Sequence, residues 1–158
     1  MAVTSLWPIK GRVDKVINYA RNPEKTTEAS YEEQASLHAV DNVVEYAANE
    51  MKTECRSYVT CLNCEEDTAA HQFIETKKLW QGLSGRYKLG GRACYHGYQS
   101  FKADEVTAEI AHEIGVKLAQ ELWGDRLEVV VATHCNTGHY HTHFVINSVS
   151  FRDGIKFH

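Results

Sequence analysis

Four of the nine histidines in this 158-residue chain lie between His134 and His143. An apolar run, LEVVVAT, leads into His134, and a His-x-His-x-His sequence (His139, His141, His143) opens a second apolar run. Histidines scattered over a surface would not gather in this way. The spacing therefore predicts a site at which several imidazoles act together.

The two apolar runs have the pattern of a β-hairpin. Successive side chains of a strand point to opposite faces, so His139, His141 and His143 share one face of the second run. The residues between the runs, 136–138, are Asn, Thr and Gly, which are typical of turns. If His134 pairs with His141, both side chains point to the same side and His143 is a diagonal neighbour. A slip of one residue would move His134 to the opposite face.

Three neutral imidazoles that converge can hold a divalent cation. The alternative is a polar sheet face with titrating histidines, but such a face is costly beside apolar residues unless something pairs with the rings. We therefore expect a metal site with His134, His141 and His143 as ligands. His139 is the alternative third ligand, or it orients a ligand, or it contacts substrate.

Tyr19 is a second residue that could do chemistry. It follows a short helical pattern over residues 13–20 and precedes Asn22-Pro23, which ends that pattern. A tyrosine hydroxyl has an unperturbed pKa of about 10, so it needs a nearby cation or proton acceptor to attack a substrate. The alternative is a tyrosine that only packs at the end of a helix.

The composition is that of one globular domain, residues 1–158, with 43% hydrophobic and 24% charged residues. No apolar run is long enough to span a membrane, and the first residues carry no apolar signal-peptide segment. Five cysteines, an odd number, are typical of a reducing compartment. These features predict a cytoplasmic protein. The net charge of −4 argues against a general nucleic-acid coat but allows a local basic groove.

Cys61 and Cys64 form a lone Cys-x-x-Cys pair. A structural zinc site needs two further ligands at a matching spacing, and none stands out in the sequence. We do not expect zinc there.

The remaining patterns predict an α+β fold, a mainly antiparallel sheet with helices packed over it. The order is β-α-α-β-α-β-α-β-β. Strands are expected at 2–8, 55–64, 93–101 and in the two arms of the hairpin. Helices are expected at 13–20, at 38–51, from Asp67 as a cap to about 80–82, and from 102–104 to 122. Connections are expected at 24–36 and, basic and glycine-rich, at 84–92. An Asp153-Gly154 pair indicates a final turn.

Three segments carry a family resemblance, in the order in which the family has them. They are YARNPEKT from Tyr19, HGYQSF from His96, and His134 followed by HTHFVIN from His141. In these segments the chain resembles the MobP-type conjugative relaxases, the mobilisation nucleases of the HUH endonuclease superfamily that are carried by mobile elements of Gram-positive bacteria. The likeness spans essentially the whole chain.

The resemblance implies a five-stranded antiparallel sheet with a metal site at its centre. It implies site-specific nicking of one strand of single-stranded DNA at an origin of transfer. Tyr19 would form a 5′-phosphotyrosyl link, while His134, His141 and His143 would hold Mg²⁺ or Mn²⁺ against the scissile phosphate. The implied partners are origin DNA, accessory transfer proteins and a coupling protein.

Single-stranded DNA is gripped by aromatic rings and by cationic side chains. The candidates in this sequence are Lys25, Arg86, Lys88, Arg92, Tyr95 and Tyr98. His96 is a further candidate, either as a phosphate contact or as a residue that orients a ligand. A plain surface or core role is the alternative for each of them.

The chain departs from the family pattern in two places. Many relaxases have an acidic residue two positions after the first metal histidine, where this chain has Asn136, and an amide cannot accept a proton. His139 could take over that task. Relaxases also continue well past the position of His158, so we expect a domain that is truncated at its C-terminus.

Three other functions fit parts of the pattern. A rolling-circle replication initiator or transposase of the same superfamily would usually carry its tyrosine after the histidines, whereas Tyr19 precedes them. A DNA-binding module without catalysis would bind DNA whether or not Tyr19 is intact. A small metallohydrolase would cleave through a metal-bound water and leave no protein–DNA adduct.

Overall fold

The structure is a computed structural model that describes residues 2–10, 28–49, 53, 58–84, 91–136 and 138–158. Side chains are described from residue 36 onward within the first helix. The expected helix at 13–20 and the basic connection at 84–92 lie wholly or mostly outside the described residues.

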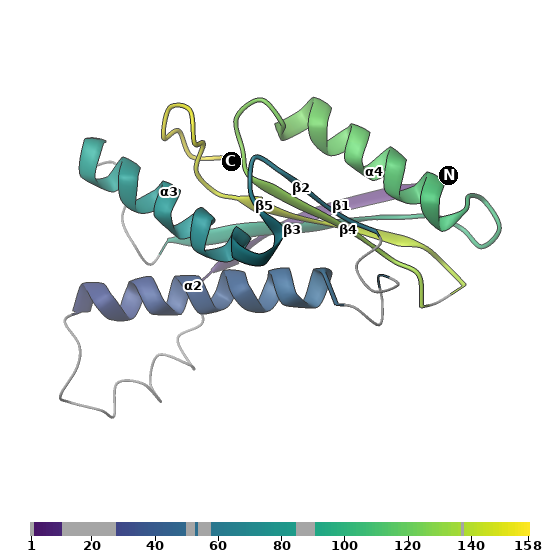
Figure 1. Ribbon diagram of the computed structural model, residues 1–158, viewed down its shortest axis with the longest axis horizontal. Helices are drawn as coiled ribbons and strands as arrows, with labels where there is room; N and C mark the ends of the chain where they lie inside the picture. The colour runs from purple at the N-terminus through teal and green to yellow at the C-terminus, as the bar shows by residue number, and fades with distance from the viewer. Residues whose placement is uncertain (1, 11–27, 50–52, 54–57, 85–90, 137) are drawn as a thin grey trace.

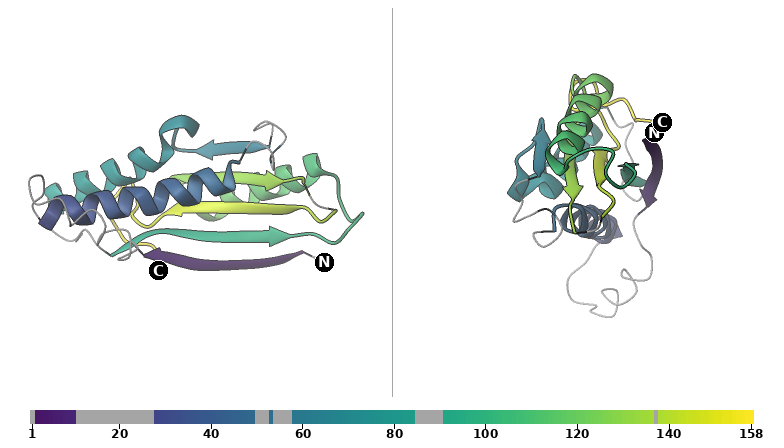
Figure 2. Two further views of the ribbon diagram at one scale, coloured as in Figure 1. Left: turned by 90° about the horizontal axis from the view of Figure 1, so that it is seen from below. Right: turned by 90° about the vertical axis from the view of Figure 1, so that its right-hand side faces the viewer.

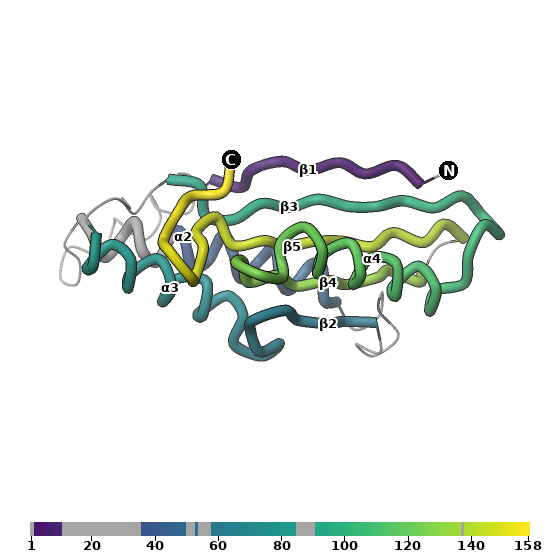
Figure 3. The backbone as a smooth tube through the Cα atoms, turned by 90° about the horizontal axis from the view of Figure 1, so that it is seen from above, coloured from purple at the N-terminus to yellow at the C-terminus, as the bar shows by residue number. Residues whose placement is uncertain are grey.

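Five strands form a single sheet in which every neighbouring pair is antiparallel, with the order β1-β3-β5-β4-β2 (Figure 3). Pro8 lies in β1, an edge strand, where a residue without an N–H is tolerated. The expected antiparallel α+β fold is confirmed. The strands are β1 (Val3–Lys10), β2 (Val59–Leu62), β3 (Arg92–Ser100), β4 (Val129–His134) and β5 (His141–Asn147).

Helices cover both faces of the sheet (Figures 1 and 2). Helices α2 (Glu28–Ala47) and α3 (Ala69–Ser84) pack on one face, and α4 (Ala108–Trp123) packs on the other. Within the described part of the chain, no helix has the length and apolarity needed to cross a membrane.

The alternation in the central strands creates these two apolar layers. Val130 and Val145 face α2 and α3, whereas Val131, Phe144 and Ile146 face α4. All five side chains are at most 1% exposed. Strands that are buried on both faces read as continuous apolar runs, which explains the VVV of β4.

The hairpin prediction is confirmed in its register. His134 pairs with His141, and Ala132 pairs with His143. The final turn is also present, since Gly154 adopts a φ of 68° and Val149 bridges to Lys156. A positive φ of this size favours glycine over any residue with a Cβ.

The starts of α2 and α3 were predicted wrongly. Residues 24–36 were expected to form a loop, but α2 already begins at Glu28. Asp67 was expected to cap α3, but it lies inside a short 3₁₀ turn, Glu66–Thr68, and α3 follows from Ala69. A tight 3₁₀ turn therefore precedes α3 and moves its start to Ala69.

Helix α4 begins later than expected. It was predicted to start at 102–104, but Thr107 is the N-cap, and its hydroxyl accepts a hydrogen bond from the backbone N–H of Ile110 at 3.3 Å. A side-chain oxygen at this position satisfies one of the unpaired N–H groups of the first turn. Gly124 ends the helix as predicted.

Candidate functional site

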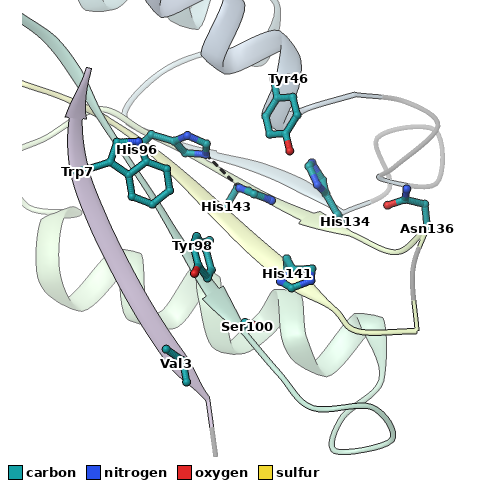
Figure 4. A pocket seen from close by; sticks show the side chains of 10 residues that line it. All are labelled: Val3, Trp7, Tyr46, His96, Tyr98, Ser100, His134, Asn136, His141 and His143. Carbon is teal, nitrogen blue, oxygen red and sulfur yellow. Dashed lines mark hydrogen bonds between the residues drawn. The ribbon is translucent and has the colours of Figure 1, made fainter. Parts of the chain in front are cut away.

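Histidines from three neighbouring strands lie on one face of the sheet. His96 is on β3, His134 ends β4, and His141 and His143 are on β5. They line a cavity of about 600 Å³ (Figure 4). The complete lining is Val3, Trp7, Tyr46, His96, Tyr98, Ser100, His134, Asn136, His141 and His143.

We call these four residues, His96, His134, His141 and His143, the histidine cluster. Three of their imidazole rings, those of His96, His134 and His143, are in contact. The ring centroids of His134 and His143 are 4.1 Å apart, and those of His96 and His143 are 5.3 Å apart. His96 Nε2 and His143 Nδ1 are hydrogen-bonded at 3.1 Å, so one of these two nitrogens carries the proton.

The end of α2 fixes the orientation of His134. Its Nε2 donates to the backbone carbonyl of Ala47 at 2.8 Å. In that tautomer Nδ1 is the unprotonated nitrogen, which is the form that can ligate a metal. A carbonyl partner of this kind is typical of histidines that bind metals.

Two imidazoles of the site, those of His96 and His141, favour the neutral form. Burial lowers the pKa of His96, and the nearby His134 lowers it further. Burial also lowers the pKa of His141, with a smaller effect from His139. A neutral ring is the ligand form, because a cation can bind only a deprotonated nitrogen.

The imidazole nitrogens of the histidine cluster are therefore chemically suited to bind a divalent cation. Among the described residues, however, no three His, Cys, Asp or Glu side chains already form a metal-binding group. Instead, His96 and His143 are hydrogen-bonded to each other, and His134 is hydrogen-bonded to the Ala47 carbonyl. Coordination by His134, His141 and His143 remains a prediction that requires these rings to turn toward a common point.

The structure gathers His134 rather than His139 with the His-x-His pair. His139 is exposed in the turn before β5 and does not line the cavity. Asn136 does line the cavity, at its rim, where its side chain is exposed (Figure 4).

Tyr46 was not anticipated from the sequence. It is on the last turn of α2, and its ring lies edge-on to three imidazoles, with centroids 5.6 Å from His134, 5.8 Å from His143 and 6.2 Å from His96. Figure 4 shows its hydroxyl pointing toward the histidines. The sequence holds no signal for this contact, because it depends on how α2 crosses the sheet.

Trp7 was also missed, and its place follows from strand pairing. Trp7 on β1 pairs with His96 on β3, so both side chains lie on the cavity face. The Trp7 ring is 4.9 Å from His96 and 5.9 Å from Tyr98, centroid to centroid. Tyr98, a predicted DNA contact, is therefore inside the cavity, and Trp7 lies beside it.

Of the other predicted site residues, the structure describes only Arg92 and Tyr95, and neither lines this cavity. Tyr19, Lys25, Arg86 and Lys88 lie outside the described residues. Arg92 begins β3, where its guanidinium donates to the Tyr95 hydroxyl at 2.8 Å. Tyr95, in turn, packs on the α4 face.

The structure thus places a histidine cluster at the centre of a five-stranded antiparallel sheet, with the Tyr46 ring of α2 beside it. Residues 46–158 match the family of relaxases described as "MobA/VirD2-like, nuclease domain". The match covers most of the chain, so the chain belongs to this family. The expected membership among relaxases is confirmed.

Curated relatives carry related names. The chain is 40% identical over 96 residues to "Protein rlx" of Staphylococcus aureus, which is 61% of this chain and 28% of that protein. It is 32% identical over 108 residues to "Group II intron-interrupted relaxase LtrB" of Lactococcus lactis subsp. cremoris (strain MG1363), which is 56% of this chain and 19% of that protein. The chain thus spans less than a third of the length of these relatives.

Proposed function

We propose that this chain is the catalytic domain of a relaxase that nicks one strand of DNA at an origin of transfer, for conjugative transfer or mobilisation. The observation that carries the proposal is the histidine cluster in a family of nuclease domains. Single-stranded origin DNA is the proposed substrate, accessory transfer proteins and a coupling protein are the proposed partners, and the bacterial cytoplasm is the proposed location.

The proposed reaction is a transesterification. The Tyr19 hydroxyl attacks the scissile phosphorus, the bond from phosphorus to the 3′ oxygen breaks, and the 3′ oxygen leaves as a hydroxyl after taking up a proton. The product is a 5′-phosphotyrosyl link, which the 3′ hydroxyl can attack to restore the strand. No bond energy is lost in the intermediate, so the nick is reversible.

The histidines have separate tasks in this proposal. His134, His141 and His143 would hold Mg²⁺ or Mn²⁺, which neutralises charge on the phosphate as phosphoryl transfer requires. His96 is hydrogen-bonded to His143, so it orients that ring. His139 is the proposed proton acceptor for Tyr19, since Asn136 cannot accept a proton.

A cleavage assay tests the proposal. The protein is incubated with a pool of single-stranded oligonucleotides from origin regions and Mn²⁺, and the products are separated on a denaturing gel. We expect a protein–DNA adduct that is lost completely in Tyr19→Phe, because phenylalanine has no nucleophile. We also expect EDTA to abolish the adduct and added Mn²⁺ to restore it.

Tyr46→Phe is the matched control, since its hydroxyl is the phenol that points at the histidines in Figure 4. Peptide mapping of the adduct distinguishes the two tyrosines, and an adduct on Tyr46 would reassign the nucleophile. Cleavage without any adduct would contradict the tyrosine mechanism and indicate hydrolysis by a metal-bound water. Binding of DNA without cleavage, unaffected by EDTA or Tyr19→Phe, would indicate a binding module.

A further inference from the structure

We propose that Trp7 and Tyr98 form a nucleobase-stacking subsite beside the histidine cluster, and that it takes the base of the nucleotide next to the scissile phosphate. This inference rests on the proposed function, because Trp7 and Tyr98 would hold the single-stranded DNA that the relaxase nicks. The ligand is single-stranded DNA of any sequence, because every base has a face that can stack.

The first argument is the exposure of Trp7. Its side chain is 37% exposed on an edge strand, and that exposed surface faces the cavity. Val3, on the same face of β1, is 60% exposed and lines the cavity as well. An open aromatic surface beside a polar cluster is informative, whereas a single exposed apolar side chain would not be.

The second argument is ring geometry. The Trp7 ring is inclined by 56° to His96 and by 69° to Tyr98. Neither contact is a parallel stack, so neither of these two neighbours lies flat against the indole face. A planar base can then lie against the indole face while His96 and Tyr98 keep the ring in place.

The third argument is the path from Trp7 to the cluster. The ring centroids of Trp7 and His96 are 4.9 Å apart, and His96 is hydrogen-bonded to His143. The ring centroids of His143 and His134 are 4.1 Å apart. A phosphate at these imidazoles is one side chain away from the indole. One nucleotide can therefore place its phosphate on the histidines and its base on Trp7 at the same time.

The fourth argument is the chemistry of the wall. Trp7, Val3 and the Tyr98 ring offer apolar area and π faces, and the hydroxyls of Tyr98 and Ser100 are the polar groups nearby. No described Lys, Arg, Asp or Glu lines the cavity. Such a wall binds bases by stacking, with little discrimination between them.

The experiment compares Trp7→Ala with Leu6→Ala. Leu6 is the adjacent residue of β1, is 41% exposed, and pairs with Gly97, so its side chain points to the opposite face. Binding is measured by fluorescence anisotropy with labelled oligothymidylate and with an abasic oligonucleotide of the same length. Both variants are first checked for folding by circular dichroism.

We expect Trp7→Ala to weaken binding of oligothymidylate roughly tenfold, which is the loss of one base–aromatic stack. Trp7→Phe should lose less, because it keeps a smaller ring. Leu6→Ala should bind as the wild type does, and the abasic chain should bind the wild type and Trp7→Ala equally.

Two results would overturn the subsite. One is equal binding of oligothymidylate by the wild type and by Trp7→Ala. The other is that Trp7→Ala weakens binding of the abasic oligonucleotide as much as binding of oligothymidylate. Absence of binding to the wild type would overturn it too, together with the proposed substrate. The cleavage assay separates the two proposals. An adduct with no effect of Trp7→Ala on binding leaves nicking intact without the subsite, and Trp7-dependent binding with no cleavage leaves the subsite intact without nicking.

Discussion

Asn136 lies at the rim of the cavity, two positions after His134. The family resemblance implies an acidic residue there, which could accept a proton or hold an imidazole by a charged hydrogen bond. We expect Asn136→Asp to increase the rate of nicking by roughly tenfold, below the range of 10²–10⁴ that is typical of a fully placed general base.

The measurement is the initial rate of adduct formation in Mn²⁺. Asn136→Ala is the control, because it removes the amide without adding a carboxylate. A rate for Asn136→Asp no higher than that of the wild type would mean that the amide is sufficient at this position, and that another group, such as His139, takes the proton.

At the residue scale, the sequence predicted the histidines of the site but not the aromatic residues Trp7 and Tyr46. Local alternation and one turn are enough to place His134 opposite His141, because the hairpin is contiguous in sequence. Trp7 and Tyr46 could not be foreseen. Their positions depend on the pairing of β1 with β3 and on the path of α2, which link residues that are far apart in the chain.

At the scale of elements, α4 lies very close to β5. A Cβ at Gly115 of α4 would come far inside contact distance of the Thr142 methyl group. We expect Gly115→Ala to lower the free energy of unfolding by about 1–3 kcal/mol, the usual cost of overpacking a dense interface. Urea denaturation measures this change through its midpoint and slope.

Gly82→Ala, in α3, is the matched control, since nothing lies within 4 Å of its added Cβ. It should stabilise the protein by up to about 1 kcal/mol, because alanine is the better helix former. Equal effects of the two substitutions would contradict the close packing of α4 on β5.

The sequence predicted the helices and strands that bury apolar residues at regular spacing. It did not predict the helix starts that lack an apolar stripe or that depend on which residue caps the helix. The strands around His96 and His134 were found by their alternation. The start of α2 was missed because residues 28–36 are mostly polar and carry no apolar stripe. The cap of α4 was placed too early because Asp104 and Thr107 are both good capping residues, and only Thr107 makes the bond.

At the scale of the whole molecule, two ionisable side chains, Lys77 and Glu128, are buried between α3 and the sheet. Lys77 is fully buried, and its amine donates to the carbonyl of Ala93. Burial lowers the pKa of Lys77 to about 8, and the nearby Cys94 and Glu128 only partly oppose this. Above about pH 8 the amine is therefore mostly neutral in the folded protein, while in the unfolded chain its pKa keeps the ordinary value of 10.5.

This difference gives a pH dependence with a defined sign. Between pH 8 and pH 10.5 the unfolded state binds more protons at Lys77, so the free energy of unfolding rises with pH, by at most about 1.4 kcal/mol per pH unit. We expect the free energy of unfolding of the wild type to rise with pH relative to that of Lys77→Met, as measured by urea denaturation between pH 8 and pH 10.5. Lys78→Met controls for the loss of one positive charge, and parallel curves for wild type and Lys77→Met would contradict the burial effect.

Among the described strands, the middle strand of the sheet comes last in the sequence. β5 lies between β3 and β4, yet it follows every other described strand in the sequence and ends at Asn147. Until then β3 can pair only with β1, β4 only with β2, and each pair has an open edge that can recruit another chain. A nascent chain must therefore reach residue 147 before the two halves can join, and translation that stalls earlier would yield aggregation-prone fragments without the histidine cluster.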